Sequence, residues 1–169
     1  MQLSRMFFEQ LNRESAATRR TVERVPQGHN DWKPHKKSMT LGYLAALVAS
    51  MPGWAEFMIE RDELDLSHPS AGRFKAKVVE SRGELLKILD DGLAKSRRAL
   101  EATTDEHLQR PWRFLMSGQV LFEAPRYIAL NENLFCHMAH HRGQLTVYLR
   151  LNEAGVPAIY GPSADEMHA

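Results

Sequence analysis

Residues 130–148, LNENLFCHMAHHRGQLTVY, carry an apolar stripe with helical spacing. On a helix that advances about 100° per residue, four apolar side chains lie within about 40° of Leu134. Such a stripe predicts a helix with one face buried against the rest of the protein. The four side chains are Leu130, Met138, Leu145 and Tyr148.

Two histidines fall on the buried side of this predicted helix. His141 lies about 20° and His137 about 60° from the centre of the stripe, whereas His140 points about 120° away. Burying an imidazole is costly unless it is hydrogen-bonded or metal-bound. The i, i+4 spacing suits two ligands of one metal ion, so a metal site and a pair of hydrogen-bonded core histidines both stay open. Met138 replaces the glutamate of an H-E-x-x-H metalloprotease, which excludes that class.

The size and charge of the chain predict one domain over residues 1–169. The 22 basic and 21 acidic residues leave a net charge of +1. This balance provides no basic surface for nucleic acid and no attraction to a membrane surface. The longest uncharged run, residues 38–55, is too short and too polar to span about 30 Å of hydrocarbon, and the N-terminal residues do not resemble a signal peptide. We therefore expect a cytoplasmic protein with no nucleic-acid or membrane partner.

The single cysteine, Cys136, excludes an internal disulfide and fits a reducing compartment. It lies about 100° around the helix from His137, so it faces elsewhere. We expect a small buried apolar side chain at this position rather than a nucleophile.

Helical patterns dominate the rest of the sequence and predict an all-α, four-helix-bundle fold. Pro52 predicts a kink or break near Met51, and residues 103–106 predict a cap followed by a short helical turn. Residues 110–124 are the least helical and predict a loop or an irregular hairpin. The long helices are expected at about residues 3–25, 40–63, 77–102 and 125–155.

Three segments of the chain resemble the DinB/YfiT-like family: residues 137–166, HMAHHRGQLTVYLRLNEAGVPAIYGPSADE, residues 39–54, MTLGYLAALVASMPGW, and residues 31–34, DWKP. Together they extend the resemblance over essentially the full chain. It implies an up-down-down-up four-helix bundle with a long crossover loop before the last helix. It also implies a homodimer.

The resemblance implies a divalent metal, Zn²⁺ or Ni²⁺, held by one histidine of the second helix and two of the last. His137 and His141 match the last two ligands. The second-helix position is Leu47, which has no donor atom, so the expected site is incomplete. Asn133, Glu132 and His35 are the candidates to replace the missing ligand.

Two functions follow from the resemblance. Relatives include thiol S-transferases and isomerases that use bacillithiol, mycothiol or glutathione. One interpretation is therefore a metal-dependent enzyme of this kind with an impaired metal site, acting on a small thiol or electrophile. The other is a non-catalytic member that serves as a binding or interaction module. The sequence identifies neither the catalytic residues nor the substrate.

Residues that flank the histidines suggest supporting roles. Arg142 and Gln144 would orient an anionic substrate, or support the histidines from behind, or cap or bridge helices. Gly143, in the middle of the helix, predicts the close approach of another helix. The tryptophans would pack in the core or line a cleft; they are Trp32, Trp54 and Trp112.

Overall fold

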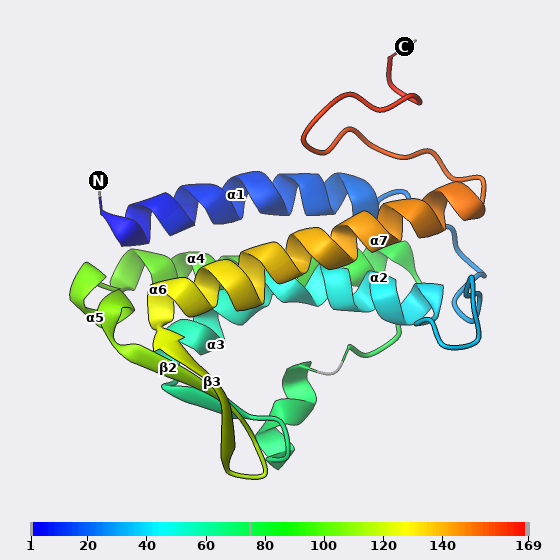
Figure 1. Ribbon diagram of the computed structural model, residues 1–169. Coiled ribbons are helices and arrows are strands. Elements are labelled where there is room, and N and C mark those ends of the chain that lie inside the picture. The colour runs from blue at the N-terminus through cyan, green and yellow to red at the C-terminus, as the bar shows by residue number, and fades with distance from the viewer. Residues whose placement is uncertain (1, 75, 168–169) are drawn as a thin grey trace.

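A computed structural model of the protein describes residues 2–74 and 76–167. Figure 1 shows the long helices lying side by side, with α1 and α7 running in one direction and α2 and α4 in the other. The connection between α4 and α7 contains a hairpin that projects from one end of these helices (Figure 1). The long helices are α1 (Leu3–Val22), α2 (Leu41–Ser50), α4 (Arg82–Ala102) and α7 (His137–Leu151).

The predicted break in the second helix is confirmed. A 3₁₀ turn, Met51–Gly53, separates α2 from α3 (Trp54–Glu60). Pro52 has no N–H to continue the helical ladder. At this turn the backbone also contacts α4, because a Cβ on Gly53 would lie 2.9 Å from the Cα of Gly92.

Capping residues set the start of α4 and α5. The predicted start of α4 at residue 77 is wrong: the helix begins at Arg82, where Ser81 and Glu84 form a capping box. The predicted short turn is confirmed as α5 (Asp105–Gln109), capped by Thr104.

The all-α prediction is wrong for one part of the chain, because the mostly helical fold also contains a small sheet. Its strands are β1 (Glu63–Asp65), β2 (Pro111–Met116) and β3 (Gln119–Pro125), with β1 parallel and β3 antiparallel to β2. Ser117 and Gly118 have φ values of 52° and 76°, as a tight hairpin turn requires. Asp65 accepts hydrogen bonds from both of their backbone N–H groups, at 3.1 and 2.8 Å, which joins β1 to the hairpin.

The last helix starts as α6 (Arg126–Ala129) and becomes π-helical over Leu130–Cys136 before α7. The sequence predicted a regular α-helix throughout. The structure differs from this prediction in the wider π-helical turns over Leu130–Cys136. The predicted apolar stripe is nevertheless buried. A π segment of this kind often occurs beside a functional site. The buried stripe residues are Leu130, Leu134, Met138, Leu145 and Tyr148.

A buried arginine fixes the start of this helix. The guanidinium of Arg126 is fully buried and donates to the backbone carbonyls of Met58 (2.7 Å), His107 (3.0 Å) and Arg61 (3.2 Å). It also forms an ion pair with Asp62 at 2.6 Å. These bonds connect the ends of α3 and α5 to the start of α6.

The C-terminal residues after α7 are held by ion pairs. Arg150 binds both carboxylate oxygens of Asp165, at 2.9 and 2.6 Å, and this contact lowers the pKa of Asp165 to about 2. Arg24 pairs with Glu166 at 2.5 Å. Within residues 2–74 and 76–167, no helix has the length and apolarity needed to cross a membrane.

Glycines in two helices have opposite environments. The predicted close approach at Gly143 is wrong, because no atom of another described helix would lie within 4 Å of a Cβ there. The close approach occurs instead at Gly92, where a Cβ would lie 3.0 Å from the Cα of Gly53.

We predict opposite effects for one substitution at these two sites. Gly92→Ala forces a methyl group against the backbone of Gly53 and should lower the free energy of unfolding by about 1–2 kcal/mol. Gly143→Ala should raise it by about 0.5–1 kcal/mol, because alanine favours an exposed helix interior. Urea denaturation followed by circular dichroism measures both, and equal effects of the two variants would contradict the helix packing described here.

Candidate functional site

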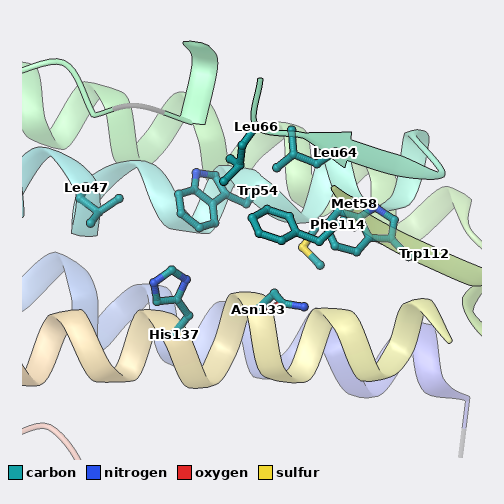
Figure 2. Close-up of a pocket in the computed structure, with 9 residues that line it drawn as sticks. All are labelled: Leu47, Trp54, Met58, Leu64, Leu66, Trp112, Phe114, Asn133 and His137. Atoms are coloured by element: carbon teal, nitrogen blue, oxygen red, sulfur yellow. The ribbon is translucent and has the colours of Figure 1, made fainter. Parts of the chain in front are cut away.

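A cavity of about 360 Å³ lies between the α2–α3 segment, the sheet and the last helix. In Figure 2, His137 projects from the last helix toward the opposite wall, where Phe114 lies between Trp54 and Trp112. The side chain of Asn133 lies along the same helix (Figure 2). Seven of the nine lining residues carry apolar or aromatic side chains. The nine are Leu47, Trp54, Met58, Leu64, Leu66, Trp112, Phe114, Asn133 and His137.

The tryptophans divide between cavity and core. Trp54 and Trp112 line the cavity, and the Trp54 ring lies 5.8 Å from the imidazole of His137. Trp32 instead packs edge-on against Tyr148, with ring centroids 5.4 Å apart. The sequence analysis predicted either core packing or a cleft for each tryptophan. No feature of the sequence decided between the two.

The histidine pair has the predicted geometry. The Nε2 atoms of His137 and His141 are 2.8 Å apart, so one donates a hydrogen bond and the other accepts it. His140 is exposed, as its angular position predicted. The Nδ1 atom of His141 lies 2.8 Å from Oε1 of Gln144, which gives Gln144 a role in orienting this ring.

Burial keeps the pair uncharged near neutral pH. It lowers the pKa of His137 below 6.5, the neighbouring His141 lowers it further, and a hydrogen bond with the backbone of Asn133 acts in the opposite direction. Burial also lowers the pKa of His141, against the effect of its bond to Gln144. The pair therefore presents neutral imidazoles to its surroundings.

These residues do not fit a three-ligand metal centre. Two imidazole nitrogens on one tetrahedral Zn²⁺ would be about 3.3 Å apart, wider than the 2.8 Å observed. Leu47 shares the cavity wall with His137 and offers no donor. Among the described residues, no group of three histidine, cysteine, aspartate or glutamate side chains could hold a metal ion. Of the candidate replacements, only Asn133 lines the cavity, whereas Glu132 and His35 are exposed.

Arg142 bridges elements, as one of its interpretations predicted. Its buried guanidinium donates to Oε2 of Glu14 at 2.6 Å and to Oγ1 of Thr18 at 3.1 Å, both on α1. It also donates to the hydroxyl of Tyr160. The prediction of a buried side chain at Cys136 is wrong, because this residue is exposed.

Two polar groups of the cavity escaped the sequence analysis. The Nε1 atom of Trp112 and the Nδ2 atom of Asn133 are buried, and neither has a hydrogen-bond partner in the described part of the chain. Buried donors normally find partners, so these two N–H groups require an explanation. No feature of the sequence indicated them, because their state depends on how the sheet packs against the last helix.

Solved structures show which fold this is. A DinB-like protein from Bacillus subtilis, YjoA, aligns with a TM-score of 0.67 and 19% identity over 92% of this chain and 98% of its own. A DinB-like protein from Bacillus cereus aligns with a TM-score of 0.67 and 21% identity over 91% and 95%. Comparison of the sequence with family models and with curated proteins gives no match. The structural matches confirm the predicted DinB-like fold.

The buried histidine pair predicts a pH dependence. The unfolded chain takes up protons on these imidazoles near pH 6.5, and the folded protein does so only at lower pH. The free energy of unfolding should therefore fall as the pH drops below about 6.5. NMR titration of the histidine Hε1 resonances, assigned with His137→Gln and His141→Gln, should give midpoints below 6.5 for both. A midpoint above 6.5 for either would show that the pair is held in its charged form.

Proposed function

We propose that this chain, which has the fold of DinB-like proteins, binds a small uncharged and mostly apolar molecule in the cavity beside Trp54. This proposal follows the interpretation of the chain as a binding module without a three-ligand metal centre. The observation that carries it is the cavity itself, about 360 Å³ in volume and lined mainly by apolar and aromatic side chains. Sites for small molecules have this size range and this lining.

The chemistry of the lining favours an uncharged ligand. Within residues 2–74 and 76–167, no aspartate, glutamate, lysine or arginine is among the lining residues, and burial keeps His137 neutral. A charged ligand would lose its hydration in this cavity without gaining a counter-ion. Trp54, Trp112 and Phe114 provide large apolar surfaces for the body of the ligand.

The contact between His137 and His141 supports a second candidate, a divalent-metal enzyme of the thiol S-transferase or isomerase kind. Both rings are neutral, as metal ligands must be, and a modest rotation would separate their Nε2 atoms to a ligating distance. A low-molecular-weight thiol would be the external ligand of such a site, and an electrophile its second substrate. Because Leu47 leaves the donor set incomplete, we assign no reaction step to a metal. The homodimer and the cytoplasmic location likewise stay predictions from the resemblance.

Filling the cavity should abolish ligand binding. We predict that N-phenyl-1-naphthylamine, a neutral fluorescent probe, binds the protein at one molecule per chain. Leu47→Phe places a larger side chain in the cavity wall and should weaken this binding about tenfold or more, because the volume for the probe is lost. Val147→Phe, which adds an aromatic ring on the exposed face of α7, is the matched control and should leave the affinity unchanged. Equal affinities for wild type and Leu47→Phe would place the probe elsewhere.

Restoring a donor at position 47 tests the metal candidate. The wild-type protein should bind Zn²⁺ or Ni²⁺ weakly, since two imidazoles leave the coordination incomplete. Leu47→His should strengthen binding by several kcal/mol, and His141→Gln in that background should reverse the gain. The metal-free Leu47→His variant should be less stable by about 1–3 kcal/mol if its imidazole has no partner. In titration calorimetry, tight binding by the wild type that Leu47→His leaves unchanged would show that another residue already completes the site.

A further inference from the structure

We infer that the ligand of the cavity is a neutral aromatic carbonyl compound whose oxygen accepts hydrogen bonds from Trp112 and Asn133. This inference rests on the proposed function and names the class of molecule that the cavity binds. Its basis is the pair of buried N–H donors, Nε1 of Trp112 and Nδ2 of Asn133, that line one cavity and find no acceptor in the described chain.

The indole of Trp112 is the stronger of the two observations. The side chain is 2% exposed and belongs to the cavity wall, and its Nε1 atom is closed off from bulk solvent. Tryptophan can only donate through this atom. A ligand with an acceptor oxygen would satisfy a donor that the folded chain leaves unpaired.

Asn133 places a second donor on the opposite wall. It lies on the π-helical segment, on the wall that faces Trp112 and Phe114 across the cavity (Figure 2). A carbonyl oxygen has two lone pairs and can accept from two donors. An alcohol would bring a hydrogen that neither N–H can accept.

The remaining walls favour an aromatic body on this carbonyl. The rings of Trp112 and Phe114 are nearly parallel, with an interplanar angle of 21° and centroids 6.4 Å apart. With Trp54 they form an aromatic surface along the cavity, against which a planar ring system can pack. Because no charged side chain lines the cavity among the described residues, the neutral carbonyl is preferred to a carboxylate of the same size.

Matched naphthalene derivatives separate the contribution of the acceptor oxygen to the affinity from the contribution of the apolar ring system. The probes are 2-acetylnaphthalene, which carries a ketone; 2-isopropenylnaphthalene, in which a CH₂ group replaces the oxygen; 1-(2-naphthyl)ethanol; and 2-naphthoate. Displacement of N-phenyl-1-naphthylamine from the wild-type protein gives their affinities. The ketone should bind at least about tenfold more tightly than the alkene, because it gains about one net hydrogen bond. It should also bind more tightly than the alcohol or the carboxylate.

Substitutions then assign the effect to the two donors. Trp112→Phe and Asn133→Leu each remove an N–H group, and each should reduce the preference for ketone over alkene toward unity. Trp32→Phe removes an indole N–H outside the cavity and should preserve the preference. The carbonyl ¹³C resonance of labelled 2-acetylnaphthalene bound to the wild type should lie downfield of its position in cyclohexane, a test that needs no variant.

The outcomes distinguish this inference from the proposed function. Equal affinities for ketone and alkene, or a bound carbonyl resonance at the cyclohexane position, would overturn the inference and leave an apolar binding site. Tightest binding of the alcohol or the carboxylate would also overturn it. The site would then recognise a hydroxyl donor or a negative charge on the ligand rather than a carbonyl acceptor. Failure of all four probes to bind would overturn the proposed function together with the inference.

Discussion

The buried guanidinium of Arg126 is the interaction on which the arrangement of the cavity depends. Its four hydrogen-bonding partners lie at the end of α3, in the segment just after α3, and in α5. Arg126 itself lies at the junction between β3 and the last helix. A buried charge of this kind is tolerated only when its donors are satisfied, so the elements around it have little freedom to shift. The elements that surround the cavity are therefore held in fixed positions. They contribute Met58 from α3, Trp112 from β2 and Asn133 from beyond α6.

The sequence predicted the parts of this structure that depend on periodicity and on backbone chemistry. The stripe centred on Leu134 identified the buried face of the last helix and the convergence of His137 and His141, even though π turns interrupt the regular helix. Pro52 likewise identified the break after α2. The irregular hairpin, one of the two alternatives predicted for residues 110–124, is present as β2 and β3. The third strand was missed because β1 has only three residues and pairs with a strand 50 positions away, Glu63 with Arg113, which no local pattern indicates. The unpaired donors were missed for the same reason.

Position 47 connects the two candidate functions. The resemblance implies a histidine ligand at this position, whereas Leu47 extends the apolar wall that begins at Trp54. The same replacement leaves His137 and His141 to bond to one another and to stay neutral. Our proposal is that this site, where the resemblance implies a metal ion, binds an uncharged molecule instead. The fold supports either use, and the side chains at this site favour the second.

The most direct test of this account is native mass spectrometry of the untagged protein, combined with elemental analysis of the same preparation after exhaustive dialysis. The account predicts a metal content well below one ion per chain, since two histidines on one helix hold a divalent ion weakly. It also predicts that addition of 2-acetylnaphthalene produces a complex with one molecule per chain. One zinc or nickel ion retained per chain, with no complex formed by the ketone, would contradict the account and identify the histidine pair as a working metal centre.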